Sequence, residues 1–328
     1  MVGLPETIHK RQADWNRLEQ MIGEISARGT RGIPGKRLAE VCSLYRAACA
    51  DLSMADQYRL SPEMVNYLHG LVGKAHNALY RSRRFQLQLW WDVLFRQAPR
   101  QIFTDRCVHI CSILFFGVFA FSSYLAYNEE AYPGFAERVM GTDMMQMMEE
   151  QYEAVEFERG VGENVIAVSG YINHNTGIGL QCFALGPLVI PGLLTTGFNA
   201  CLLGTTFGYM AREGTPGGDN FLEFVTAHGP FELTAIALAA AAGLRIGLGW
   251  LIPRNLIRLD SMQARAQEAI PVMAASVMLF FLAAMTEGMI SPSSLPYLAK
   301  VLWGMFSSTL LMFYFVVLGY PSGDSDAA

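Results

Sequence analysis

One stretch of about 35 residues in this sequence, Thr176–Met210, contains no charged side chain. A single straight crossing of a bilayer needs only about 20 apolar residues. Pro187 and Pro191 lie near the middle of the stretch, where proline favours a turn over a continuous helix. The stretch therefore predicts two transmembrane helices joined by a tight hairpin, at residues 174–190 and 193–211.

Four further apolar runs have the length of a membrane crossing. They are residues 107–127, 231–252, 270–289 and 299–318. Charged residues make up only 16% of the 328-residue chain, against roughly a quarter in an average soluble domain. This composition excludes a disordered chain and most soluble enzymes. We therefore expect an all-α fold, a polytopic membrane helix bundle of six spans within residues 106–320.

The placement of arginine distinguishes six spans from five. Cytoplasmic loops of membrane proteins carry an excess of Lys and Arg, and the segment 253–269 contains Arg254, Arg258 and Arg265. If the uncharged stretch crossed only once, this segment would lie outside. Six spans place it in the cytoplasm with both termini, and they place the acidic, arginine-poor loop 128–173 outside. We expect a multi-pass cell-membrane protein with this topology, and five spans are the alternative.

The first 105 residues are expected to form a cytoplasmic helical domain. Apolar side chains recur at helical spacing in two segments, 15–25 and 38–49. A serine followed by Pro62 is typical of a helix start, because serine caps the helix and proline fits the first helical position. The third helix is expected to run from Pro62 to about Ala98.

The charge and the tryptophans of this first domain favour a location beside the membrane. Basic residues outnumber acidic ones in residues 1–106 by roughly sixteen to ten, which favours the cytoplasmic side. Trp90 and Trp91 are typical of an anchor at the membrane surface, although tryptophans in the core of a helical bundle fit the sequence equally well. Net charge is −5, so we expect no nucleic acid as a partner. The basic segment before the first span favours membrane lipid as a partner.

The sequence carries no motif of an enzyme. The six cysteines form no C-x-x-C pair, and neither H-E-x-x-H, a Walker A loop nor a nucleophile elbow is present. We therefore expect no metal, no cofactor and no catalytic activity.

Several polar side chains lie within or beside the predicted spans, where an ionisable group costs about 2.5–3.5 kcal/mol on insertion scales. The candidate residues are Asn173, Asn175, Asn199, His228, Glu232, Arg245 and Glu287. Arg245 needs a carboxylate, backbone carbonyls or a water-filled cavity. By depth, Glu232 and Glu287 lie closer to the outer side than Arg245, so the sequence assigns it no direct partner. Hydrogen bonds between spans are the favoured role of these groups, and a solute path is the alternative.

Small residues recur four apart in two of the spans. Gly204 and Gly208 form one such pair, and Gly243 and Gly247 form another. This spacing lets helix backbones approach closely. We expect the helices between residues 174 and 252 to form a tightly packed core, which argues against a wide pore.

Three motifs together resemble the stage II sporulation protein M family over about residues 100–320. They are Asn173-His174-Asn175 before the glycine-rich hairpin with Gly197-Phe198-Asn199, His228-Gly229-Pro230-Phe231-Glu232, and Gly243-Leu244-Arg245-Ile246-Gly247. The strongest element is the His-Gly-x-x-Glu start followed by Gly-Leu-Arg-x-Gly. The N-terminal third looks like the extension of longer members of the family.

This resemblance implies a multi-pass membrane component of a larger assembly. In spore formers, members of the family act with cell-wall hydrolases during engulfment and hold partners at the membrane. We therefore expect a non-enzymatic scaffold that binds other membrane or cell-envelope proteins, with self-association left open. A transporter or permease-like subunit is the alternative, and an intramembrane hydrolase using His228 and Glu232 is a third hypothesis.

Overall fold

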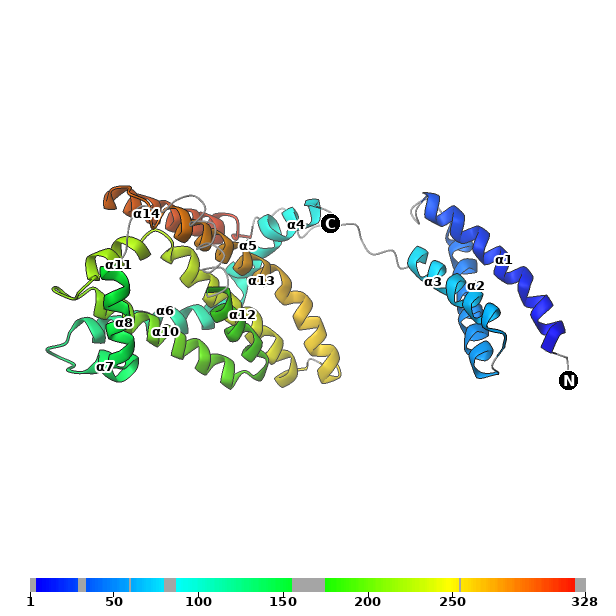
Figure 1. The fold of residues 1–328 in the computed structure, drawn as a ribbon, viewed down its shortest axis with the longest axis horizontal. Coiled ribbons are helices and arrows are strands. Elements are labelled where there is room, and N and C mark those ends of the chain that lie inside the picture. Colours follow the sequence, from blue (N-terminus) through cyan, green and yellow to red (C-terminus); the bar gives the residue numbers. More distant parts are fainter. Residues whose placement is uncertain are drawn as a thin grey trace. The chain divides into compact units, whose positions relative to one another are not determined.

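The computed structural model describes the chain in six stretches. These are residues 4–28, 34–58, 60–79, 87–154, 175–253 and 255–321. Every regular element in these stretches is helical, so the expected all-α class is confirmed for them (Figure 1). The chain divides into two compact units, Met1–Gln86 and Leu87–Ala328, which are described separately below.

The first unit is a bundle of three helices. These are α1 (Leu4–Arg28), α2 (Gly35–Gln57) and α3 (Pro62–Leu79), and each contacts the other two. The predicted start at Pro62 is confirmed. The apolar stripes of the sequence form its core, in which the buried side chains include Leu18, Val41, Leu68 and Leu71.

A buried carboxylate ties the first two helices of this unit together. Asp51 on α2 accepts a hydrogen bond of 2.8 Å from Trp15 Nε1 and one of 2.7 Å from Arg11 Nη2, both from α1. A buried charge is stable only when it is paired and hydrogen-bonded. Nothing in the local sequence predicted this contact, because its partners lie about 40 residues apart.

The boundary of the second unit differs from the predicted boundary at residue 105. Residues 87–104 form α4 (Leu87–Asp92), η2 (Val93–Gln97) and α5 (Ala98–Thr104), and η2 and α5 pack on helices of the second unit. The sequence predicted one helix from Pro62 to about Ala98. The structure instead has α3 in the first unit and separate helices from Leu87 onward in the second, and residues 80–86 lie outside the described stretches. Trp91 is 65% exposed, which excludes a place in the core of either unit.

Four described helices of the second unit are long and apolar enough to cross a membrane. They are α6 (Arg106–Tyr127), α12 (Gly229–Leu251), α13 (Arg258–Met289), and α14 (Tyr297–Met312) with its continuation η4 (Phe313–Val317). They coincide with four of the six predicted spans.

The other two predicted spans fall on a helical hairpin. Residues 175–185 are helical, η3 (Gly186–Leu188) forms the turn, and α10 (Ile190–Met210) leads away from it. Val189 has a positive φ of 60°, which marks the sharp change of direction. The predicted turn is confirmed, whereas the number of membrane crossings stays a prediction.

Helix α12 is the centre of the second unit. It packs most extensively on α13 and also contacts α6, α10, α14 and η3, while α6 pairs along its length with α10 (Figure 1). All ten residues from Ala235 to Leu244 are buried and apolar. Alanine and glycine dominate this run, so the neighbouring helices can approach the α12 backbone closely.

The paired glycines lie at these close approaches. A Cβ atom on Gly204 would come within 2.2 Å of Phe119 O on α6, and one on Gly243 within 2.4 Å of Phe183 O. Gly186 in the turn meets Gly243 in the same way, because a Cβ atom on Gly186 would come within 2.3 Å of the Gly243 carbonyl carbon. The predicted role of the small residues is thus confirmed.

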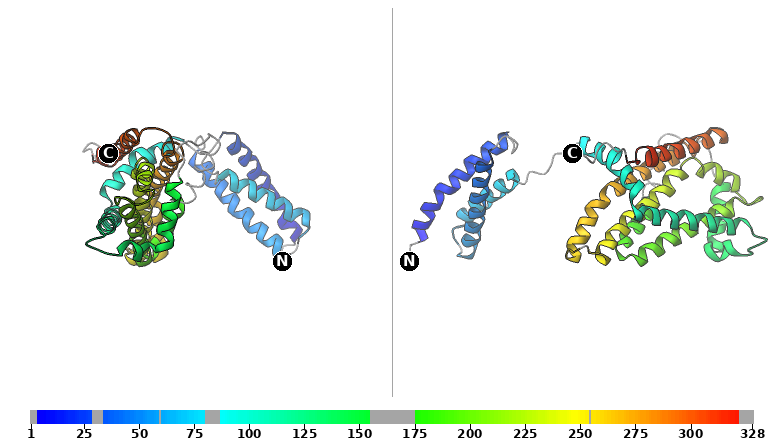
Figure 2. Two further views of the ribbon diagram at one scale, coloured as in Figure 1. Left: turned by 60° about the vertical axis from the view of Figure 1, so that its left-hand side comes forward. Right: turned by 180° about the vertical axis from the view of Figure 1, so that it is seen from behind.

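The helix ends gather at two opposite ends of the second unit (Figures 1 and 2). At one end, the start of α6 and the last third of α12 meet through Asp105 and Arg245. At the other, Arg212 after α10 pairs with Glu129 after α6 at 2.6 Å. We call these the arginine end and the histidine end, since His228 at the start of α12 lies at the second.

The methionine-rich piece of the predicted outer loop is helical. α7 (Phe135–Met140) and α8 (Thr142–Glu153) contact each other at the histidine end, and α8 packs on α11 (Gly218–Val225). Met144, Met145 and Met148 lie against the buried cluster around Tyr152. These three methionines therefore pack on their own chain.

Candidate functional site

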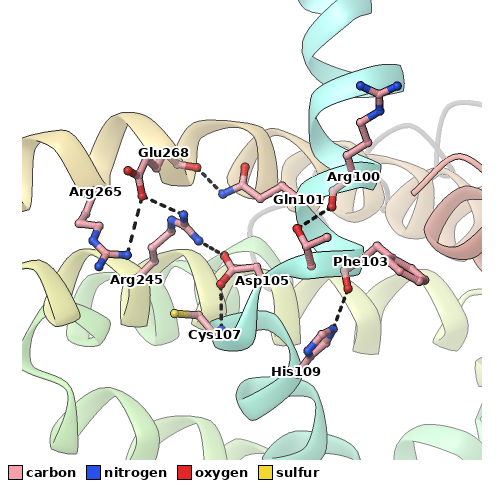
Figure 3. Close-up of polar contacts among 10 residues, drawn as sticks. Arg100, Gln101, Phe103, Asp105, Cys107, His109, Arg245, Arg265 and Glu268 are labelled. Carbon is pink, nitrogen blue, oxygen red and sulfur yellow. Dashed lines mark hydrogen bonds and ion pairs between the residues drawn. The ribbon is translucent and has the colours of Figure 1, made fainter. Parts of the chain in front are cut away.

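The arginine end holds the partners that the sequence could not assign to Arg245. Its Nη2 lies 2.8 Å from Glu268 Oε2 on α13, and its Nη1 pairs with Asp105 Oδ2 at the start of α6 (Figure 3). The side chains of Arg245 and Asp105 are 17% and 5% exposed. Both partners lie outside the candidate residues of the sequence, so this prediction was incomplete.

Asp105 reaches Arg245 because it also caps a helix. Its backbone is extended, and its Oδ1 accepts a hydrogen bond of 2.9 Å from Cys107 N in the first turn of α6. This is the usual role of aspartate at a helix N-terminus. One carboxylate thus begins the first predicted span and balances a charge on α12.

Glu268 extends the network to a fourth element. Its backbone carbonyl accepts a hydrogen bond of 2.6 Å from Gln101 Nε2 on α5, and Arg265 Nη1 lies 3.8 Å from its carboxylate. Figure 3 shows Arg245 between Glu268 and Asp105, with Arg265 approaching from α13. Two arginines and two carboxylates therefore balance in charge where α5, α6, α12 and α13 meet.

The histidine end brings together three of the predicted residues. His228 directly precedes α12, Glu232 follows one turn later, and Glu287 projects from the last turns of α13. One nitrogen of His228 and one oxygen of each carboxylate all lie within 4.8 Å of one another. His228 and Glu287 are buried, at 4% and 7% exposed.

Two further side chains hold this cluster in place. Asn175 Nδ2 donates a hydrogen bond of 2.8 Å to Glu287 Oε2, and Ser291 Oγ lies 2.9 Å from His228 Nδ1. The carbonyl oxygen of Ser291 accepts a hydrogen bond of 2.9 Å from Lys300, whose ammonium also pairs with Glu223 at 2.8 Å. Ser291, Lys300 and Glu223 were missed. The sequence did single out Lys300, because it is the only lysine after Lys74.

The remaining candidate residues do not join either cluster. Asn199 Nδ2 bonds to Thr195 O at 2.9 Å within α10 and lies 3.8 Å from Cys182 Sγ. Asn173 lies outside the described residues. The buried, apolar run Ala235–Leu244 of α12 separates Glu232 from Arg245.

The comparisons with known proteins give two family matches. The model of the family "Stage II sporulation protein M" matches residues 112–292, and a domain of unknown function, DUF8413, matches residues 6–81. Neither the curated proteins nor the solved structures contain a significant match.

The first match covers more than half of the chain. It includes the His228–Glu232 start of α12, Arg245 and Glu287, while the second match falls within the first compact unit. Four helices long and apolar enough to cross a bilayer agree with the family. The chain is therefore a membrane protein that belongs to the stage II sporulation protein M family.

Proposed function

We propose that this protein is a non-enzymatic membrane scaffold that holds partner proteins in a larger assembly. The observation that carries the proposal is the buried face of α12, which is apolar from Ala235 to Leu244 between the two polar clusters. A transported solute would need polar groups or water along such a route. Close packing of α12 against its neighbours instead suits a protein that presents fixed surfaces to partners.

The internal pairing of Arg245 also supports a scaffold. Charged groups of a transport path face a cavity or a pathway, whereas the Arg245 guanidinium binds Asp105 and Glu268 of its own chain. This pairing joins three helices and leaves the surface of the bundle for partners. The separate helical unit before residue 87 adds a second surface, in the cytoplasm under this proposal.

We propose that the second unit crosses the membrane six times with both termini in the cytoplasm. The hairpin at Gly186–Leu188 then turns at the cytoplasmic side, and α7, α8 and α11 lie outside. The arginine end, with Arg258 and Arg265 near the start of α13, faces the cytoplasm, in agreement with the excess of Arg in cytoplasmic loops.

Purification from native membranes tests the scaffold. A tagged chain produced at native level and extracted in mild detergent should recover membrane or cell-envelope proteins in a fixed ratio. A matched chain that begins at Leu87 tells which partners depend on the first unit, and an unrelated multi-pass protein with the same tag controls for background. A chain that purifies alone from native membranes contradicts the proposal.

The transporter alternative is tested by flux. If Arg245→Ala folded normally and abolished uptake or efflux of a defined solute in proteoliposomes, transport would replace the scaffold as the proposed function. Under the scaffold proposal, reconstituted wild-type protein produces no flux above empty vesicles.

A further inference from the structure

The cluster at the histidine end has the composition of a metal site. It contains one imidazole and two carboxylates, contributed by the start of α12 and the end of α13. Imidazole nitrogen and carboxylate oxygen are both ligands of zinc and related divalent ions. The third ligand, Glu287, is remote in sequence from His228 and Glu232, so no linear motif could indicate the set.

The spacing of the donor atoms fits a single ion. Ligand atoms at 2.0–2.2 Å from a tetrahedral zinc ion lie about 3.4 Å apart. His228 Nε2 lies 3.6 Å from Glu232 Oε2, which is close to this value and beyond a hydrogen bond. All three donor atoms lie within 4.8 Å of one another, so rotation of the carboxylates is enough to bring them around one ion.

The second layer of contacts orients the ligands as in known metal sites. A histidine that binds a metal usually gives its other ring nitrogen to a hydrogen bond. His228 Nδ1 has such a partner in Ser291 Oγ at 2.9 Å, which leaves Nε2 directed at Glu232. Asn175 binds one oxygen of Glu287, Oε2, and leaves the other for an ion.

The charge and the burial of the two glutamates also favour a bound cation in this cluster. Glu232 makes no hydrogen bond with any described residue, and its side chain is only 14% exposed. Glu287 is 7% exposed in the same cluster. Two neighbouring carboxylates in such a place are costly unless a cation or protons neutralise them, and a divalent ion balances both at once.

We propose that His228, Glu232 and Glu287 bind a divalent transition-metal ion of the zinc class through His228 Nε2 and one oxygen of each carboxylate. The ion links the start of α12 to the end of α13, and water fills its fourth position. This inference does not depend on the scaffold function, and it replaces the expectation of no metal.

Metal analysis of the full chain tests the site, with Zn²⁺ as the probe. The protein carries an affinity tag without histidine, is purified in detergent, and is dialysed first against chelator and then against Zn²⁺. We expect about one zinc per chain by mass spectrometry of the metal. X-ray absorption should give nitrogen and oxygen ligands, which distinguishes this site from zinc on the six free cysteines.

Substitutions locate the ion. Glu232→Gln and Glu287→Gln keep the side-chain volume and should each reduce bound zinc to below about a tenth of the wild-type amount. Asn175→Ala should weaken the affinity about 10–100-fold, as expected for loss of a residue that orients a ligand. Glu129→Gln, at the same end but outside the cluster, is the matched control and should bind zinc like the wild type.

Measurements on the wild type alone can contradict the proposal, so the test stands even if a variant fails to fold. A chelated and reloaded wild type without zinc, or with sulfur as its zinc ligand, contradicts the site. So does full zinc binding by both glutamine variants. An unchanged melting temperature after zinc addition also contradicts it, because a ligand that binds only the folded state must stabilise it.

Discussion

Arg245 shows how a single charged residue within an apolar helix is stabilised. A guanidinium there is costly unless it is paired, and the chain supplies two carboxylates, Asp105 and Glu268, from the helices on either side. The sequence predicted that Arg245 needs a partner. It could not name Asp105, which is 140 residues away, because the contact depends on how α6 and α12 are rotated against each other.

Removal of the Arg245 charge should destabilise the second unit. Arg245→Ala leaves Asp105 buried without its counter-charge, and breaking a buried pair in this way costs about 3 kcal/mol or more. Unfolding of the protein in detergent micelles measures the change. Arg258→Ala removes an exposed arginine that lies over the Trp250 ring and should cost less than about 1 kcal/mol. Equal stability of the two variants would contradict the role given to Arg245.

Glu129 should make the histidine end sensitive to acid. A hydrogen bond from the Gly134 backbone N–H and the charge of Arg212 lower the pKa of Glu129 from its usual 4.5. A carboxylate with a lowered pKa stabilises the folded state above its unfolded pKa, and this contribution is lost as the pH falls through the folded value. The wild type should therefore melt above Glu129→Gln at pH 7, and the two should converge as the pH falls below the lowered pKa of the folded state.

The convergence is the informative part of that experiment. Parallel melting curves for the wild type and Glu129→Gln at every pH would show that the ion pair with Arg212 and the Gly134 hydrogen bond do not stabilise the fold. Glu130→Gln, at a neighbouring exposed position for which no such contact is described, is the matched control.

At the scale of whole helices, glycine sets the distance between α12 and the hairpin. Gly243→Ala places a methyl group 2.4 Å from Phe183 O, so the helices must separate. Overpacking of this kind costs typically about 1–3 kcal/mol. Gly117→Ala on α6 meets no atom within 4 Å and should be neutral or stabilising, because alanine favours helix over glycine. Thermal unfolding of both variants measures the contrast, and a Gly243→Ala protein as stable as Gly117→Ala contradicts the packing.

The sequence predicted the positions of the long helices and of the turn, but not the full length of α13. Apolar runs located the four long helices, and the two prolines located the turn, because these signals are local. The full extent of α13 is not a local signal. Its 32 residues span about 48 Å, more than the roughly 30 Å of a bilayer core, so the helix continues through the basic segment before residue 270.

The histidine end gives the same lesson for a site. Depth along the predicted spans placed Glu232 and Glu287 on the same side of Arg245, and the structure brings these two together with His228 and Asn175. Depth alone could not show which faces of α12 and α13 meet. Asn199 has a comparable polar side chain, but it lies on α10, where its Nδ2 donates a hydrogen bond to the Thr195 carbonyl of the same helix.

At the scale of the whole molecule, the two units should unfold independently. Asp51→Ala removes the acceptor of Trp15 and Arg11, and an unpaired buried donor costs about 1–3 kcal/mol. Hydrogen exchange of the full chain should then lose protection in α1–α3 and keep it in α12 and α13. Loss of protection throughout the chain would contradict the division at Gln86 and Leu87.

The central claim is that the second unit crosses the membrane an even number of times and keeps its arginine end in the cytoplasm. Single cysteines in a variant without the native ones test it directly: Leu256→Cys lies between α12 and α13, and Ser294→Cys lies between α13 and α14, both at exposed positions. A membrane-impermeant maleimide added to intact cells should label Ser294→Cys, and should label Leu256→Cys only after the cells are permeabilised. Labelling of Leu256→Cys on intact cells would contradict the account.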